Sequence, residues 1–306
     1  MTIRRLSRVI KIDRYNAWVE IDGEEKYAHV RKRVLRDTGI YPGDYAWVSE
    51  VIRGREYAVE KIVPRKNILK RPTVANVSKA IYVHTFKQPE GYLFYLDLFL
   101  MNVIHEHIKP YIVVNKVDLL SDEELQYAKE VMKTYENLGY PVIWTSVEKK
   151  EGIEELKALL DKGTIVFAGM SGVGKSSLIN TMYGLNLSVG AVSEKIGRGR
   201  HTTTYTKLIR VGEKTYVVDT PGFSLLEVPD DIEVKEVSSG FPEIAEREHL
   251  CAYPGCLHVD EPGCAVREAV EKGEIALHRY ESYLKILEAV KEKEEERKWR
   301  RRKKRR

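Results

Sequence analysis

The sequence predicts a multidomain chain: a small β-barrel first, a larger α/β domain in the middle and a helical, metal-binding domain last. Three observations support this prediction. Residues 3 to 63 alternate apolar and polar side chains with a period of two, strand-like runs alternate with helical ones from Lys79, and all three cysteines lie near the C-terminus. We expect domain boundaries at 1–68, 69–228 and 229–306.

The first 63 residues have the pattern of about five short strands without a helix, which favours a small closed barrel of the OB-fold type. Ala17, Val19 and Ile21 point one way, and the residues between them point the other. Such barrels bind nucleic acid through basic and aromatic surface. The candidates here are Arg4, Arg5, Arg8, Lys11, Arg31, Lys32, Arg33, Arg36, Arg53, Arg55, Tyr15, Trp18, Tyr45 and Trp47, although most of the aromatic residues are expected in the core.

A linker and then a parallel sheet are expected after the barrel. Residues 64–72 are polar, bounded by prolines and without periodicity, which indicates a linker. Strands are predicted at residues 80–85, 111–114 and 142–145, with helices near 92–107 and 122–138. Alternating elements of this kind form a parallel sheet with helices on its faces.

A phosphate-binding loop follows a further β-branched run at residues 164–168. Its residues fit G-x-x-x-x-G-K-[ST], in which glycines allow backbone N–H groups to turn toward phosphates. Lys175 would reach the β and γ phosphates, and the Ser176 hydroxyl would hold Mg²⁺. The predicted nucleotide-binding residues of the loop are Gly169, Met170, Ser171, Gly172, Val173, Gly174, Lys175, Ser176 and Ser177. A chance match in a glycine-rich turn is the simpler alternative.

Two further motifs indicate that the nucleotide is GTP. Asn115, Lys116 and Asp118 form an N-K-x-D motif at the end of a predicted strand, where open α/β sheets bind ligands. The Asp118 carboxylate would accept from the two N–H donors of guanine, although this motif alone also fits an ordinary helix cap. Asp219 and Gly222 form a D-x-x-G motif that would contact Mg²⁺ through water and sense the γ-phosphate.

The order of these motifs is unusual, because the base-reading motif precedes the phosphate loop. The whole chain therefore resembles the circularly permuted, ribosome small-subunit-dependent GTPase family, RsgA/YjeQ. The resemblance is most specific in residues 169–177 (GMSGVGKSS), in residues 197–204 (GRGRHTTT) and in a Cys/His cluster near the C-terminus. It implies GTP hydrolysis late in maturation of the small (30S) ribosomal subunit, with that subunit and its rRNA as partners.

The resemblance also implies roles for single residues. Ser146 and Val147 correspond to the fifth GTPase motif, in which the family usually has Ala where Val147 stands. Residues 186–204 correspond to switch I, within which Thr203 is our choice of Mg²⁺ ligand and His201 would orient the hydrolytic water. Phe223 stands where Ras-like enzymes have a water-orienting Gln. Alternatively, Arg198 or Arg200 stabilises the transition state in cis, or the partner supplies the group.

A zinc site is predicted from Cys251, Cys256, His258 and Cys264, which are spaced C-x₄-C-x-H-x₅-C. Three thiolates and one imidazole make a closed tetrahedral set, as in structural zinc sites. An odd number of cysteines does not suit a set of disulfides. The side chains of Tyr280, Tyr283, Leu284, Leu287 and Val290 share one face of a predicted final helix, which would pack this face against the domain.

Charge and hydropathy give expectations about compartment and partners. The net charge is +5, but residues 297–306 hold nine Lys and Arg and no acid, so the remainder sums to 5 − 9 = −4. Concentrated basicity suits a polyanionic partner. The first residues lack an apolar core, and residues 93–104 are too short to cross a bilayer. We expect a cytoplasmic monomer without a membrane partner, with ribosome assembly factors as further candidate partners.

Two other functions remain open from the sequence. A GTP-dependent RNA or assembly-factor adaptor with negligible hydrolysis would explain an apolar residue at Phe223. A P-loop ATPase or small-molecule kinase would require the residues 115–118 to match by accident. Hydrolysis with saturating rRNA separates the adaptor from the GTPase, and competition between GTP and ATP tests the kinase.

Overall fold

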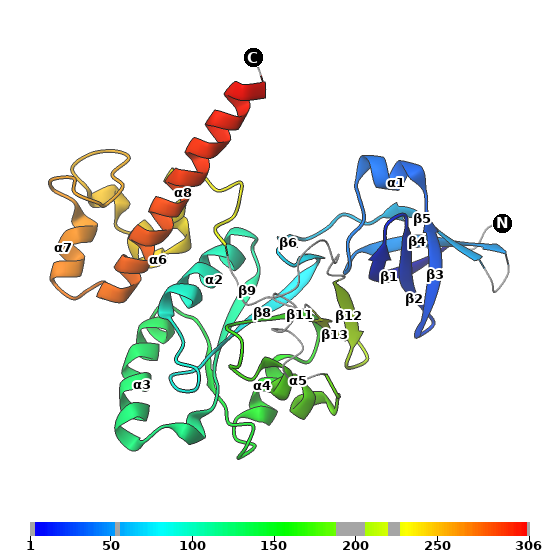
Figure 1. The fold of residues 1–306 in the computed structure, drawn as a ribbon, viewed down its shortest axis with the longest axis horizontal. Helices are drawn as coiled ribbons and strands as arrows, with labels where there is room; N and C mark the ends of the chain where they lie inside the picture. Colours follow the sequence, from blue (N-terminus) through cyan, green and yellow to red (C-terminus); the bar gives the residue numbers. More distant parts are fainter. Residues whose placement is uncertain (1–3, 53–55, 188–205, 220–226, 305–306) are drawn as a thin grey trace.

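The computed structural model describes residues 4–52, 56–187, 206–219 and 227–304. Three parts follow one another along the long axis of the molecule: the β-barrel, the α/β domain and the helical domain (Figure 1). The predicted architecture is therefore confirmed, with the barrel and the helical domain at opposite ends. No helix in the described ranges is long and apolar enough to span a bilayer.

The barrel consists of five strands around their own apolar core. In chain order they are β1 (Arg4–Asp13), β2 (Asn16–Ile21), β3 (Glu24–Val30), β4 (Tyr45–Ile52) and β5 (Glu56–Ile62). Helix α1 (Lys32–Asp37) lies between β3 and β4, so the expectation of a region without a helix is wrong; six residues are too few to show a helical period. The strands pair in the order β1-β2-β3-β5-β4, and β4 returns to β1 and closes the barrel. Ala17, Val19 and Ile21 point into the core, as the alternation predicts.

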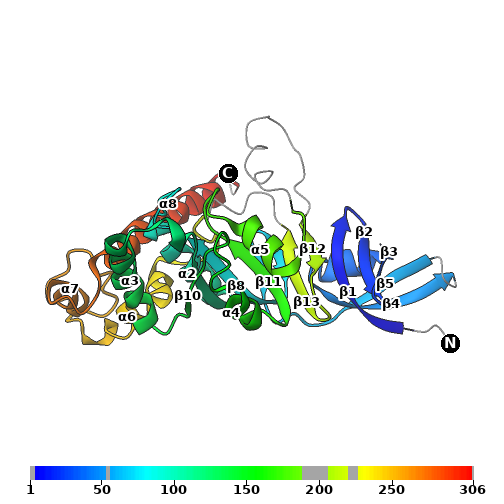
Figure 2. The same ribbon diagram turned by 90° about the horizontal axis from the view of Figure 1, so that it is seen from below.

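The barrel is joined edge to edge to the sheet of the α/β domain. Strand β1 pairs antiparallel with β12 (Lys207–Arg210) at Lys11 and Lys207, which makes one continuous 11-stranded sheet. Figure 2 shows β1 next to β12 and β13. Arg8 of β1 is buried at this junction, where it donates to Thr164 and lies 4.2 Å from the ring centre of Tyr45. Arg8 was expected on a nucleic-acid surface, and this expectation is wrong because the α/β domain covers it.

The α/β domain is a largely parallel sheet with helices on both faces. Its strands are β8 (Val77–His84), β9 (Lys109–Val114), β10 (Val142–Trp144), β11 (Gly163–Ala168), β12 and β13 (Thr215–Asp219), in the order β10-β9-β8-β11-β13-β12. Helices α2 (Leu93–His105) and α3 (Asp122–Asn137) pack on one face. Helices α4 (Ile153–Leu159) and α5 (Lys175–Tyr183) pack on the other. The predicted elements are thus present, with ends shifted by up to three residues.

The segment predicted as an unstructured linker ends in a small hairpin, β6 (Ile68–Lys70) and β7 (Thr73–Ala75). The prediction missed it because the strands have only three residues each, too few to show a period. Two asparagine side chains that flank the hairpin, Asn67 and Asn76, hold it in place. Asn67 accepts from the N–H of Val77 and donates to its carbonyl, both at 2.9 Å, while the Asn76 amide donates to Gly43 at 3.0 Å.

The helical domain packs on α2. Its elements are η3 (Val234–Gly240), α6 (Pro242–Ala245), η4 (Glu248–Leu250), α7 (Ala265–Glu271) and the long α8 (Leu277–Lys304). Tyr283, Leu287 and Val290 are buried, as the predicted apolar face requires. Leu98 and Met101 of α2 belong to the same core cluster. The basic residues up to Lys304 continue α8 beyond the domain, so that part of the tail is helical (Figure 1).

Candidate nucleotide site and metal centre

The predicted phosphate loop connects the C-terminal end of β11 to the first turn of α5. Gly169 and Gly174 have φ values of 129° and 96°, a region that disfavours residues with a Cβ. A Cβ on Gly169 would lie 2.3 Å from the Val83 carbonyl oxygen, and one on Gly174 would lie 2.4 Å from Asn115 Nδ2. Both positions therefore require glycine. The loop opens onto the N-terminus of α5, where the helix dipole favours an anion.

Lys175 lies largely buried at the start of α5. Its Nζ donates to the carbonyl oxygens of Gly169 and Met170 at 2.6 and 2.7 Å. Burial lowers the pKa of Lys175 to about 8, because the charged ammonium loses hydration and no carboxylate among the described side chains offsets this loss. A polyanion in the loop would supply the missing negative charge.

The base-reading motif and the phosphate loop are tied together by Asn115. This residue is 2% exposed at the end of β9, and its Nδ2 donates to the Val173 carbonyl oxygen at 2.8 Å. Its Oδ1 accepts from Thr145 Oγ1 at 3.0 Å, just beyond β10. One carboxamide thus joins the ends of three elements that lie far apart in the sequence. Thr145 was not among the predicted site residues, because its role depends on this contact.

Asp118 and Ser146 lie together beside this junction. Ser146 Oγ donates to Asp118 Oδ1 and accepts from the N–H of Lys149 at 3.0 Å. The serine therefore fixes one carboxylate oxygen of Asp118. Lys116 adopts a left-handed conformation with φ of 62°, and its Nζ donates to the Gln88 carbonyl oxygen. Gln88 is a neighbour that no sequence motif indicated.

The remaining predicted nucleotide residues are only partly described. Ser176 and Ser177 lie in the first turn of α5, and Val147 packs against the core cluster under α4 and α5. Asp219 ends β13, which runs parallel to β11, so its backbone reaches the same edge of the sheet as the phosphate loop. Gly222, His201 and Thr203 lie outside the described residues, as do Arg198, Arg200 and Phe223.

The four predicted zinc ligands meet in the helical domain. Their ligand atoms all lie within 4.8 Å of one another. The Nδ1 of His258 is 3.6 Å from Cys251 Sγ and 3.4 Å from Cys264 Sγ. Bond lengths of about 2.3 Å to sulfur and 2.05 Å to nitrogen give tetrahedral edges of roughly 3.5 Å. The donor set, and the two distances from His258 to sulfur, therefore fit one zinc ion.

Hydrogen bonds around this centre hold its loops. The carboxylate of Glu261 accepts from the N–H groups of Leu257 and Val259, both at 2.8 Å. Burial alone would raise the pKa of Glu261, but the backbone donors outweigh it and lower the pKa to about 2. Tyr280 and Tyr283 of α8 donate to the carbonyl oxygens of His258 and Leu257 at 2.6 and 3.0 Å. The centre is thereby fastened to α8.

A buried ionic cluster joins the helical domain to α2 and α3. Arg279 of α8 donates to Asp97 Oδ1 at 2.7 Å and to both oxygens of Glu243 at 2.7 and 3.2 Å. Tyr135 donates to the same Asp97 oxygen at 2.8 Å. The side chains of Arg279 and Asp97 are both fully buried. In the sequence, Asp97 is the one charged residue within the apolar run of residues 93–104.

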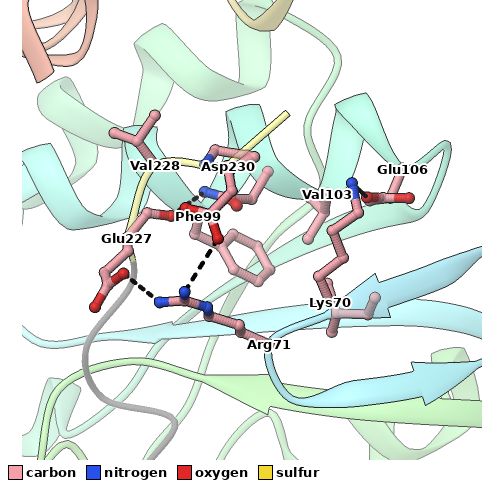
Figure 3. Close-up of a pocket in the computed structure, with 11 residues that line it drawn as sticks. Lys70, Arg71, Phe99, Val103, Glu106, Glu227, Val228 and Asp230 are labelled. Carbon is pink, nitrogen blue, oxygen red and sulfur yellow. Dashed lines mark hydrogen bonds and ion pairs between the residues drawn. The ribbon is translucent and has the colours of Figure 1, made fainter. Parts of the chain in front are cut away.

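The segment at residues 227–232 follows the D-x-x-G motif in the sequence and is held by two cations at the hairpin. Arg71 pairs with Glu227, and its Nη2 is 3.2 Å from Asp230 Oδ2 (Figure 3). Lys70 pairs with Asp231 and with Glu106, the latter at 3.2 Å. A small cavity lies between the hairpin, α2 and this segment, and the charged side chains on its rim pair with one another.

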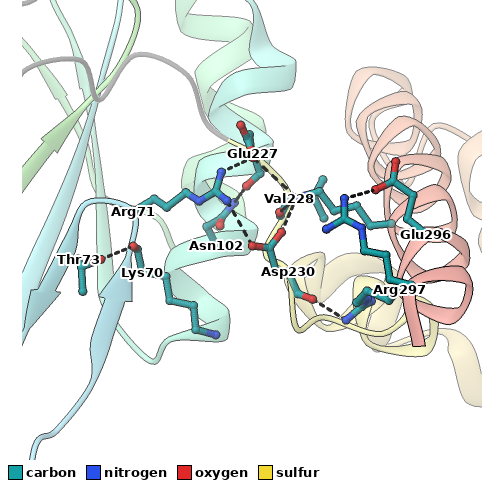
Figure 4. Close-up of polar contacts among 11 residues, drawn as sticks. Lys70, Arg71, Thr73, Asn102, Glu227, Val228, Asp230, Glu296 and Arg297 are labelled. Atoms are coloured by element: carbon teal, nitrogen blue, oxygen red, sulfur yellow. Dashed lines mark hydrogen bonds and ion pairs between the residues drawn. The ribbon is translucent and has the colours of Figure 1, made fainter. Parts of the chain in front are cut away.

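Helix α8 holds the same segment from the opposite side. Lys293 pairs with Asp230 Oδ1 at 2.9 Å and donates to the Val228 carbonyl oxygen at 2.7 Å. Arg297 donates to the carbonyl oxygens of Asp230 and Ile232 (Figure 4). The two carboxylate oxygens of Asp230 thus join the hairpin to α8.

Comparison with known proteins identifies the family. Residues 62–229 match the family profile described as RsgA GTPase, and residues 164–299 match one described as 50S ribosome-binding GTPase. A protein of Geobacillus sp. (strain WCH70), named small ribosomal subunit biogenesis GTPase RsgA, is 46% identical over 85% of this chain and 89% of its own length. The chain belongs to the RsgA GTPase family. It is therefore a GTPase, for which GTP, GDP and Mg²⁺ are the ligands.

Other members of the RsgA family resemble the chain over nearly its full length. The RsgA of Thermotoga neapolitana is 42% identical over 94% of this chain and 97% of its own. The crystal structure of YjeQ from Thermotoga maritima superposes with a TM-score of 0.80 at 36% identity, covering 94% of this chain and 99% of that one. A structure described as YloQ, a circularly permuted GTPase, gives 0.74 at 33% identity, covering 95% and 96%. The description of YloQ as circularly permuted agrees with the order of the motifs in this chain.

Proposed function

We propose that this chain acts in biogenesis of the small ribosomal subunit, where it binds rRNA and hydrolyses GTP faster when the subunit is bound. RsgA relatives from Geobacillus, Thermotoga neapolitana and Moorella thermoacetica carry this role in their names and align over 85, 94 and 89% of the chain. The geometric support is Asn115, whose carboxamide bonds to Val173 and Thr145 and so holds the base-reading and phosphate-binding motifs together.

For the guanine, we infer that Asp118 accepts from N1–H and N2–H₂. Ser146 favours this role, because its hydroxyl fixes the carboxylate. Lys116 and Val147 would line the base, and backbone groups next to Ser146 would contact the guanine carbonyl. Adenine has no pair of donors for Asp118, so an adenine nucleotide would leave a carboxylate unpaired.

For the phosphates, we infer that the N–H groups of residues 169–177 and the Lys175 ammonium bind the β and γ groups. Mg²⁺, when bound, neutralises charge that develops on the phosphates. Ser176, Thr203 and, through water, Asp219 are its proposed ligands on this chain. Gly222 would sense the γ-phosphate, and His201 would orient the hydrolytic water once the partner orders the segment that contains it.

Loss of the γ-phosphate would then be transmitted to the rest of the molecule through residues 227–232. This segment lies five residues beyond Gly222 and contacts both the hairpin beside the barrel and α8. Its exposed ion pairs are each worth about 0–1 kcal/mol, so they exchange easily. We infer that the chain works as a cytoplasmic monomer on the subunit, with assembly factors as further candidate partners.

The test is GTP turnover with and without purified small ribosomal subunits. We expect a slow rate for the isolated chain and a large increase with the subunits, while Lys175→Ala lowers both rates. His201→Ala should lower the stimulated rate and leave GDP affinity intact. Equal turnover with and without subunits would refute the proposed function.

Asp118 provides an independent test of base recognition. Asp118→Asn replaces an acceptor by a group that can donate, and we expect preference to move from guanine toward xanthine nucleotides. Competition binding with GDP, XDP and ADP measures this preference. Unchanged selectivity for GDP would contradict the assigned contact, whereas tighter ADP binding by the unaltered chain would contradict the guanine assignment as a whole.

A further inference from the structure

The α/β domain covers much of the barrel face that OB-folds commonly use for oligonucleotides, formed by strands 2 and 3. Trp18 of β2 is half-buried and packs against the core cluster of the α/β domain. Tyr216 donates to Glu20 at 3.0 Å, and Lys207 pairs with Glu25 at 2.9 Å. Side chains of β2 and β3 are therefore engaged within the molecule.

Beside the exposed Tyr27, the end of the β2–β3 hairpin is acidic. Asp22 and Glu24 are exposed at its turn, and Glu20 and Glu25 flank them. The nearby cations Arg5 and Lys26 form ion pairs with Asp22 and Glu24. Carboxylates repel phosphate groups, so this hairpin is a poor surface for RNA.

The opposite side of the barrel has different chemistry. We call it the far wall and define it by the outward side chains of the first half of β1, of β4 and of β5. Leu6, Trp47 and Lys61 lie in register across these three strands. Leu6 is 54% exposed and Trp47 is 41% exposed. Figures 1 and 2 both show β4 and β5 turned away from β12.

Positive charge borders this apolar row. Lys61 is exposed directly beside Trp47, and Arg4 is exposed two residues before Leu6 on the same strand. Arg31 and Arg33 follow on the other flank, where both pair with the single carboxylate of Glu60 at 3.1 Å. Two guanidinium groups against one carboxylate leave an excess of positive charge. An exposed aromatic ring among cations is the combination that binds single-stranded nucleic acid.

We propose that the far wall is a platform for single-stranded RNA, on which a base stacks against Trp47 while Lys61 and Arg4 contact the adjoining phosphates. The identification of this RNA as a segment of small-subunit rRNA rests on the proposed function. A protein partner would use the same apolar row without needing the cations. The cations therefore favour RNA, and the experiment separates the two partners.

The experiment measures binding of a fluorescein-labelled oligouridylate to the full chain by fluorescence anisotropy. Trp47→Ala should weaken binding about 5- to 150-fold, the effect of losing one stacked base. Tyr27→Ala is the matched control, because Tyr27 is also 41% exposed but lies on β3, outside the far wall. Lys61→Glu, an exposed change, should weaken binding and lower the salt dependence by about one phosphate contact.

Several results would overturn the platform: no binding of the oligouridylate by the unaltered chain, no effect of Trp47→Ala and Lys61→Glu, or an equal loss with Tyr27→Ala. If Trp47→Ala weakened binding of ribosomal proteins but not of the oligouridylate, the far wall would be assigned to a protein partner instead. Stimulation of GTP turnover by small subunits is measured on the same proteins. If Trp47→Ala binds RNA as the unaltered chain does and its GTP turnover is stimulated normally, only the platform is refuted. If small subunits do not stimulate GTP turnover of the unaltered chain, the proposed function is refuted.

Discussion

Replacing Arg279 by methionine should destabilise the junction between the helical domain and α2 severely. The change keeps much of the aliphatic volume but removes the charged hydrogen bonds at 2.7 Å to Asp97 and at 2.7 and 3.2 Å to Glu243. Asp97 is fully buried and Glu243 nearly so, so two carboxylates would be left in the interior without a cation. Removing one partner of a buried pair costs about 3–5 kcal/mol.

Urea denaturation, monitored by circular dichroism, measures the loss in free energy of unfolding. Hydrogen exchange of α2 and α8 shows where the structure is weakened. Lys272→Met is the control, because Lys272 forms an exposed pair with Glu268 at 3.8 Å and should change stability by about 0.5 kcal/mol or less. Combining Arg279→Met with leucine at positions 97 and 243 should recover most of the stability, since no charge is then left buried. A loss from Arg279→Met no larger than that of the control would refute this reasoning.

The nucleotide site and the metal centre give three further predictions. Burial lowers the pKa of Lys175 from 10.5 to about 8, and phosphate favours its charged form, so GDP affinity should fall as pH rises above about 8, by up to about tenfold per unit. Titration calorimetry between pH 7 and 10 measures this, and Lys175→Arg, which stays charged, should remove the dependence. Gly174→Ala should weaken GDP binding strongly, because its Cβ would lie 2.4 Å from Asn115 Nδ2; affinity equal to that of Gly184→Ala, where nothing lies within 4 Å of the Cβ, would contradict the steric argument. Cys256→Ser, or chelation, should release one zinc ion per chain and expose α7 and the first turns of α8 to hydrogen exchange, and full zinc content in the variant would reject the ligand assignment.

The sequence by itself determined the features whose chemistry is local. A phosphate loop requires glycines and a lysine within eight consecutive positions, and the zinc ligands occur within fourteen residues, so both are readable from spacing. The alternation of strands and helices likewise predicted the barrel and the parallel sheet, because the side-chain period follows from backbone geometry. The order of the motifs along the chain indicated the circular permutation. The short hairpin at residues 68–75 was missed, since three-residue strands show no period.

Only the tertiary structure decided which side chains meet across these elements. Arg8 was expected on a nucleic-acid surface, but pairing of β1 with β12 buries it against Thr164. In the sequence, Asp97 is a single charge within an apolar run, and only the fold shows that Arg279 of α8 is its partner. Such contacts join positions more than 150 residues apart, and their partners are chosen by how whole elements pack. No local period or spacing carries that information. The buried ionic cluster of Arg279 and the far wall of the barrel could therefore be found only from the fold.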